Sequence, residues 1–329
     1  MRPNARETGD SRRFVHQALI YESEEQFLAG AVPFVERGVA AGEPVLAAVQ
    51  GANAEALRAA IGTDAPGFSI VPAEDWYETS ARTREKVASW VEEHGDGGRV
   101  RLIGEPAWAL GHEAQVRDLA RHESVVNVAF ADCPVSFICP YDARTLPDEI
   151  LEHAERTHPE LVAGDGEAAA SSAYEDPHSF CSGLARDAPH AGTPVSELEF
   201  GSADLPALRR LVEWESLFAG LEPTRVDELV LAVNELATNA LVHGEAPARL
   251  MIWNEDGEVI FEVEDRGEGI GDALAGQLRP SPGGAGGRGL WLSRLMADAL
   301  EIHSDEDSNT VALHVSLPGQ ADPVRPGDR

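Results

Sequence analysis

The sequence of 329 residues predicts two domains of different fold class, an α/β domain at residues 14–162 and an α+β domain at residues 195–318. In the first part, short apolar strands alternate with amphipathic helices, which is typical of a mostly parallel sheet covered by helices. Residues 163–194 are rich in Ala, Gly, Ser, Asp and Pro without an apolar period, so we expect a linker there. Beyond it, two helices precede paired alternating strands, as in an α+β layout.

The N-terminal strands are apolar throughout, as expected when both faces of a sheet are buried. We expect them at residues 14–21, 44–49, 68–71, 100–104 and 135–139. The first helix repeats apolar residues at helical spacing. We expect helices at residues 23–39, 54–61, 79–93, 113–130 and 147–161.

In the C-terminal domain we expect helices at residues 205–218, 224–242 and 290–299. Pro223 and Thr224 are start signals for the second of these, and Gly244 follows it as a stop. Asp256 and Gly257 indicate a hairpin turn. The strands are expected at residues 195–200, 248–254, 258–264, 300–304 and 310–317.

Charge excludes several functions. The chain has 57 acidic and 26 basic residues, a net charge of −31, and Lys86 is its only lysine. Such a chain is poorly suited to binding nucleic acid or anionic lipid. Lys86 lies outside any GxxxxGK[ST] phosphate loop. We expect a cytoplasmic protein, because we find no apolar run of membrane-spanning length and no signal-peptide core. Three cysteines without a CxxC pair predict reduced, buried thiols.

The second C-terminal helix contains Glu235 and Asn239, four residues apart and therefore on one face. Carboxylate and amide oxygens there can bind Mg²⁺ or orient a nucleophile, because hard cations take oxygen ligands. Such a pair on a helix is most often simply solvated. The pair therefore indicates a functional site only together with other motifs.

Two glycine-rich segments supply those motifs. DRGEGI at residues 265–270 follows a strand, where a carboxylate can accept from an exocyclic amine and glycines allow close backbone approach. GGAGGRGL at residues 283–290 opens onto a helix N-terminus, which favours anions through free N–H groups and the helix dipole. Taken singly, the segments could equally be a plain turn and a flexible loop.

In order and spacing, the three segments resemble the N, G1 and G2 boxes of the GHKL (Bergerat-fold) ATPase/kinase superfamily, and most closely its anti-sigma-factor serine kinase branch. AVNELATNALVHG, FEVEDRGEGI and GRGLWLSRLMAD carry this resemblance. It implies ATP and Mg²⁺ as cofactors, with Asn239 as the Mg²⁺ ligand, Glu235 as general base and Asp265 as acceptor for the adenine amine. The further nucleotide-binding residues that it implies are Gly267, Gly269, Gly287, Arg288, Gly289, Leu290 and Thr310.

The N-terminal segments FVHQALIYESEEQFLAGAVPFVERGVAAGEPVLAAV, RLIGEPAW, FICPYD and HAERTHPEL resemble the MEDS sensory domain, a degenerate relative of RecA/KaiC-like ATPases. The expected place of a phosphate loop reads ESEE at residues 22–25, which is acidic and lacks glycine. The resemblance implies sensing of a small molecule rather than ATP hydrolysis. Candidate pocket residues are His16, Glu105, Trp108, Tyr141 and Asp142.

The leading hypothesis is a signalling regulator that binds a sigma factor, or phosphorylates serine or threonine on a STAS-type antagonist protein, or does both. It would act without touching DNA or a membrane, and a homodimer is one assembly that this interpretation allows. A sensor histidine kinase is an alternative, but His178 and His190 lie in a segment whose Pro and Gly content does not suit helices. A nucleotide-gated binding module without catalysis is the other alternative.

Overall fold

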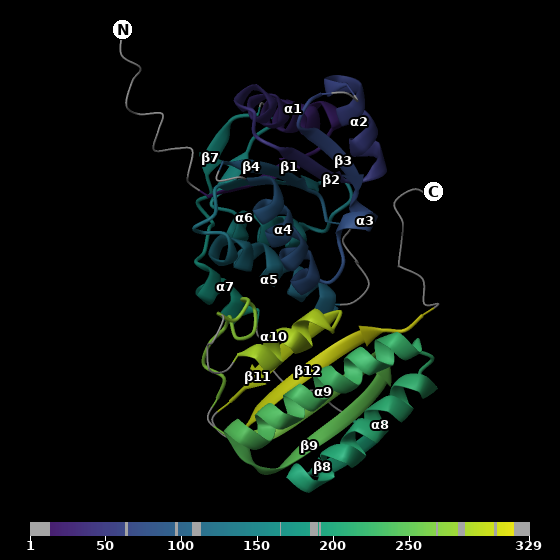
Figure 1. The fold of residues 1–329 in the computed structure, drawn as a ribbon. Coiled ribbons are helices and arrows are strands. Elements are labelled where there is room, and N and C mark those ends of the chain that lie inside the picture. Colours follow the sequence, from purple (N-terminus) through teal and green to yellow (C-terminus); the bar gives the residue numbers. More distant parts are fainter. Residues whose placement is uncertain are drawn as a thin grey trace. The chain divides into compact units, whose positions relative to one another are not determined.

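The computed structural model describes residues 14–62, 65–95, 98–106, 113–164, 166–184, 190, 192–267, 269–281, 287–305 and 308–318. The chain divides into two compact units, the first built mainly by the chain up to Phe180 and the second mainly by the chain from Cys181 onward. Figure 1 shows the elements of both units. None of the described helices is both long and apolar enough to cross a membrane.

The first unit contains a sheet in the order β3-β2-β4-β5-β1-β6-β7, in which only the β6–β7 pair is antiparallel. The predicted parallel sheet is therefore confirmed. Its strands are β1 (Val15–Tyr21), β2 (Val45–Val49), β3 (Phe68–Pro72), β4 (Val100–Gly104), β5 (Val135–Asp142), β6 (Glu160–Val162) and β7 (Ala168–Ala170).

Helices cover both faces of this sheet (Figure 1). α1 and α2 pack on one face around Leu19, Phe27 and Leu57, whereas α4, α5 and α6 lie on the other. The side chain of Ser23 caps α1, and Gly42 ends that helix with φ 70°. The helices are α1 (Glu24–Ala41), α2 (Gly51–Ile61), α3 (Ala73–Trp76), α4 (Ser80–Gly95), α5 (Glu113–Ala129), α6 (Asp148–Thr157) and α7 (Pro177–Gly183).

The segment that we predicted as a linker contains secondary structure. β7 pairs with β6, and α7 follows. The predicted helix over residues 147–161 is also too long, since α6 ends at Thr157 and the chain turns into β6. Both short strands escape a periodicity analysis because three residues give no measurable alternation.

The second unit is an antiparallel sheet in the order β11-β12-β10-β9-β8, with helices on one face. Its strands are β8 (Ser196–Phe200), β9 (Gly244–Glu255), β10 (Glu258–Gly267), β11 (Ala299–Ser304) and β12 (Asn309–Ser316). The 3₁₀ turn η2 (Ser202–Asp204) leads into the helices α8 (Leu205–Phe218), α9 (Pro223–His243) and α10 (Arg288–Leu295).

The core of this unit lies between the helices and the sheet. Leu229, Val233 and Leu236 of α9 are buried in one cluster with Phe261 and Leu313 of the sheet. Burial of these side chains fixes the rotation of α9 and leaves its remaining face for polar residues. The predicted hairpin turn is present, because Asp256 has φ 51° and Gly257 has φ 83°, the positive values that such a turn requires.

Candidate nucleotide site

Helix α9 positions the first two candidate residues. Leu236, Ala237 and Ala240 are buried in the core, whereas Glu235 and Asn239 are half-buried one turn apart. A one-turn separation places both polar groups on the same side of the helix. The structure therefore presents a carboxylate and an amide together, as the spacing predicts.

The first turn of α10 lies directly against this pair. A Cβ added to Gly289 would lie 2.9 Å from Oε2 of Glu235, 3.1 Å from Nδ2 of Asn239 and 3.4 Å from its Oδ1. Only glycine leaves the two polar groups undisturbed at this distance. Gly287 caps α10 with φ 76°, a left-handed conformation that also favours glycine.

Asp265 lies near the end of β10, against the C-terminal turn of α9. A Cβ on Gly244 would collide with Oδ1 of Asp265 and would lie 2.6 Å from the carbonyl oxygen of Ala240. A Cβ on Gly267 would lie 2.9 Å from the Cα atom of Gly244. Asp265 thus lies close to the helix end that follows Asn239. Burial raises the pKa of Asp265, although a hydrogen bond from Asn309 partly opposes the shift.

Asn309 is the residue that the sequence interpretation missed. Its Nδ2 donates to Oδ1 of Asp265 at 3.1 Å, and its Oδ1 accepts from the backbone N–H of Ile270 at 3.1 Å. The strand register pairs Asp265 with Asn309, whereas Thr310 pairs with Glu264. The hydrogen-bond partner of Asp265 is therefore Asn309 and not the neighbouring Thr310, which is buried one register position away. The sequence does contain a signal for this residue, since an Asn directly precedes the expected threonine.

The remaining candidates lie around these two groups. Arg288 and Gly269 are exposed, and Leu290 is half-buried and packs against Gly276. Glu268 and residues 282–286 of the glycine-rich loop lie outside the described residues. A cavity of about 190 Å³ opens beside Asp265, lined also by Glu199, Glu245, Ala246, Pro247, Ala248, Arg249, Glu264 and Arg266, but not by Glu235 or Asn239. We therefore base the site on the packing around Gly289 and Asp265 rather than on this cavity.

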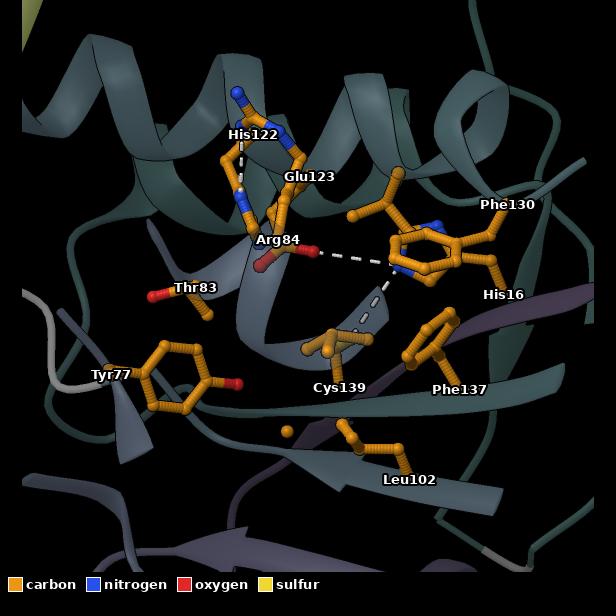
Figure 2. Close-up of a pocket in the computed structure, with 13 residues that line it drawn as sticks. His16, Tyr77, Thr83, Arg84, Leu102, His122, Glu123, Phe130, Phe137 and Cys139 are labelled. Atoms are coloured by element: carbon orange, nitrogen blue, oxygen red, sulfur yellow. Dashed lines mark hydrogen bonds and ion pairs between the residues drawn. The ribbon is translucent and has the colours of Figure 1, made fainter. Parts of the chain in front are cut away.

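A different cavity lies within the first unit (Figure 2). Its volume is about 30 Å³, room for little more than a water molecule or two. Of the predicted pocket residues, His16 lines it, whereas Glu105, Tyr141 and Asp142 do not, and Trp108 lies outside the described residues.

Two family models match the chain. Residues 15–159 match the MEDS domain, described as the MEthanogen/methylotroph, DcmR Sensory domain. Residues 202–315 match the histidine kinase-like ATPase domain. The protein is thus a sensory domain followed by an ATPase-like domain, as the motifs predict.

Among solved structures, the chain is similar to the crystal structure of the RsbU and RsbW domains of Rv1364c from Mycobacterium tuberculosis. The identity is 18% and the TM-score 0.28, over 38% of this chain and 33% of that one. The chain therefore spans about a third of the length of that structure. No curated protein matches the sequence.

The histidine kinase-like ATPase domain implies ATP binding. The described residues fit such a ligand in two respects. The half-buried carboxylate of Asp265 is an acceptor suited to an exocyclic amine, and the missing Cβ of Gly289 leaves the polar groups of Glu235 and Asn239 free to reach a ligand.

Proposed function

We propose that the C-terminal domain binds Mg²⁺-ATP and transfers phosphate to a serine or threonine of an antagonist protein, as an anti-sigma-factor kinase. The observation that carries the proposal is the packing of Gly289 against both Glu235 and Asn239. This packing places the N-terminus of α10, which follows the glycine-rich segment, beside the polar pair on α9. An anion-binding backbone and an oxygen-ligand pair thus share one place.

Each residue has a defined role in this proposal. Bound Mg²⁺-ATP would supply the phosphoryl group. Asn239 holds the metal through its amide oxygen, and Glu235 orients the acceptor hydroxyl and takes its proton. Asp265 accepts from the adenine amine, with its carboxylate held by Asn309. Positioning of this kind provides most of the catalysis in phosphoryl transfer.

The N-terminal domain would regulate this activity as a degenerate RecA/KaiC-like module. The turn from β1 to α1 consists of Glu22 and Ser23, and α1 begins with two further acidic residues, Glu24 and Glu25. Like charge on the three glutamates near that helix N-terminus repels phosphate. The proposal therefore assigns nucleotide chemistry to the C-terminal domain alone.

Transfer to a partner protein is favoured over transfer through a phosphohistidine. His178 lies in the seven-residue helix α7, and the Nδ1 atom of His190 lies 2.8 Å from a carboxylate oxygen of Glu262. Neither histidine belongs to a pair of long helices that could dimerise and present it. The proposed partners are a sigma factor and a STAS-type antagonist.

The test incubates the full chain with γ-labelled ATP, with and without a candidate antagonist, and follows the chemical stability of the label. Acid-stable label on the partner supports the proposal, and acid-labile, base-stable autophosphorylation contradicts it in favour of a histidine kinase. ATP binding without any label supports a pure binding module.

Two variants test the roles. Glu235→Gln should retain ATP binding and lose transfer, because the amide cannot take the proton. Asn239→Ala should lose Mg²⁺-dependent binding. Full transfer activity in Glu235→Gln would show that Glu235 is not the general base. Asn234→Ala, one position before Glu235 on the same helix, is the matched control.

A further inference from the structure

Four buried side chains of the first unit converge on one point. His16 from β1, Glu123 from α5, Cys139 from β5 and His158 at the end of α6 each offer one metal-binding atom. These four atoms all lie within 4.8 Å of one another, and no side chain of the set is more than 6% exposed. Figure 2 shows His16 linked to both Glu123 and Cys139 at the wall of the cavity.

Three of the distances within this set match those between ligands around an ion. Nε2 of His16 lies 3.5 Å from Oε2 of Glu123, and Nε2 of His158 lies 3.6 Å from the same oxygen. Both exceed the usual range of about 2.7–3.2 Å for N–H···O hydrogen bonds. Zn–N bonds of about 2.0–2.1 Å and Zn–S bonds of about 2.3 Å give tetrahedral ligand–ligand edges of roughly 3.3–3.6 Å. The 3.5 Å between Sγ of Cys139 and Nε2 of His16 fits the same geometry.

A second set of hydrogen bonds orients His16. Nδ2 of Asn127 donates to the carbonyl oxygen of Thr157 at 2.8 Å, which turns Oδ1 of Asn127 toward Nδ1 of His16 at 3.1 Å. An amide oxygen only accepts, so Nδ1 carries the proton of the neutral ring and Nε2 keeps its lone pair. Such outer partners are usual for histidines that bind metals.

His158 is oriented in the same way. Its Nδ1 lies 2.8 Å from the carbonyl oxygen of Ala154, which can only accept, so the ring proton is on Nδ1. Nε2 of His158 has no hydrogen-bond partner among the described residues, although it is fully buried. A buried acceptor without a partner is costly, and here it faces a carboxylate that also only accepts.

We propose that His16, Glu123, Cys139 and His158 bind a divalent transition-metal ion of the Zn²⁺ class. Without a metal, a proton on Nε2 of His16 or on the Cys139 thiol satisfies one contact each and Nε2 of His158 stays unpaired, whereas a metal ion satisfies all four groups. The Cys139 thiol proton passes to solvent on binding, so that the thiolate and the Glu123 carboxylate together balance the 2+ charge. The buried site is then neutral, which avoids the cost of an unpaired internal charge.

The mixed nitrogen, sulfur and oxygen ligand set suits Zn²⁺ or Co²⁺ rather than Mg²⁺ or Ca²⁺, which take oxygen ligands. The ion would lie at the wall of the cavity that Tyr77, Thr83 and Arg84 also line. The ion would thus be buried in the sensory domain beside a space that holds little more than a water molecule or two. This site is separate from nucleotide binding in the C-terminal domain.

The test uses the full chain, purified without a histidine tag, stripped with a chelator and titrated with Co²⁺ and then Zn²⁺. We expect one metal ion per chain, a thiolate-to-cobalt charge-transfer band, and the intense d–d bands of four-coordinate cobalt, all displaced by Zn²⁺. Cys139→Ser should abolish the charge-transfer band and weaken binding by at least about 100-fold, since even second-layer changes cost about 10- to 100-fold. Cys133→Ser and Cys181→Ser are matched controls that should leave both unchanged.

Asn127→Ala provides a variant that removes no ligand. It should keep the charge-transfer band and weaken Zn²⁺ binding by about 10- to 100-fold, because His16 loses its orienting partner. Absence of stoichiometric binding in the wild type overturns the proposal, as does a charge-transfer band that persists in Cys139→Ser. The first result would mean that the cluster is a buried polar network without a metal, and the second that Cys139 is not the sulfur ligand.

Discussion

Asn309 donates a hydrogen bond to Oδ1 of Asp265 over 3.1 Å and so joins the first residue of β12 to the C-terminal end of β10. The same side chain accepts from Ser304 at 2.8 Å and from the backbone of Ile270 at 3.1 Å. Three segments of the second unit therefore meet at one amide. Its position determines where the Asp265 carboxylate points.

Asn309→Ala should weaken ATP binding because Asp265 loses the donor that holds it. The loss of a hydrogen bond to a buried partner costs about 1–3 kcal/mol, or roughly 5- to 150-fold in Kd. Titration calorimetry with ATP measures the effect. Thr310→Val, a change of similar shape at the next position, should bind normally. If Thr310→Val fails to bind and Asn309→Ala binds well, threonine and not Asn309 supports the nucleotide.

Gly289→Ala should impair the site without destabilising the fold. The new Cβ would lie 2.9 Å from Oε2 of Glu235 and 3.1 Å from Nδ2 of Asn239, so both groups must move. Alanine meanwhile favours a helix by about 1 kcal/mol relative to glycine. We expect phosphate transfer to fall by about 10- to 100-fold, as for other small displacements of catalytic groups, with the melting temperature unchanged or raised.

Gly271→Ala is the matched control for that experiment, since nothing lies within 4 Å of its added Cβ. It should retain full transfer. Equal activity of the two variants would mean that Gly289 does not shape the site.

The stability of the second unit should fall at alkaline pH because of His314. Burial by itself lowers the pKa of His314, but hydrogen bonds with Glu258 and Glu301 outweigh that effect and raise it to about 9. A folded-state pKa above the ordinary value of about 6.5 means that the stabilisation is complete below pH 6.5 and is lost as the pH rises through about 9. The loss should be about 3 kcal/mol.

Urea unfolding of the wild type at several pH values between these limits checks this expectation. His314→Gln should show a flatter pH dependence, whereas His94→Gln, at an exposed histidine, should behave as the wild type. A wild-type free energy of unfolding that is constant across this window would contradict the assignment.

Glu105 should be structural rather than ligand-binding. Its carboxylate accepts from Asn53 Nδ2 at 2.8 Å, from the backbone of Gln50 at 2.9 Å and from the hydroxyl of Tyr21 at 3.3 Å. Glu105→Ala leaves these donors without an acceptor and should cost about 2–4 kcal/mol in the free energy of unfolding. Glu55→Ala, at an exposed position of α2, should change it by less than about 0.5 kcal/mol. Equal stability of the two variants would mean that Glu105 is not structural and that it remains a candidate for ligand binding.

Apolar periodicity predicted most of both folds, because the order of apolar and polar residues within each element shows whether one face or both faces are buried. It predicted the parallel sheet and the amphipathic helix that carries Glu235 and Asn239, and the Asp-Gly pair predicted the turn at residues 256 and 257. It missed β6 and β7, which are too short to show a period, and it therefore treated structured residues as a linker.

The two fold classes were therefore determined by the sequence by itself, and so were the three motifs and their order. Only the tertiary structure decided that Gly289 lies against Glu235 and Asn239, that Asn309 and not Thr310 holds Asp265, and that His16 meets Glu123, Cys139 and His158. These are contacts between residues far apart in the chain. Strand order, register and helix placement bring them together, and no local pattern of apolar residues records those choices.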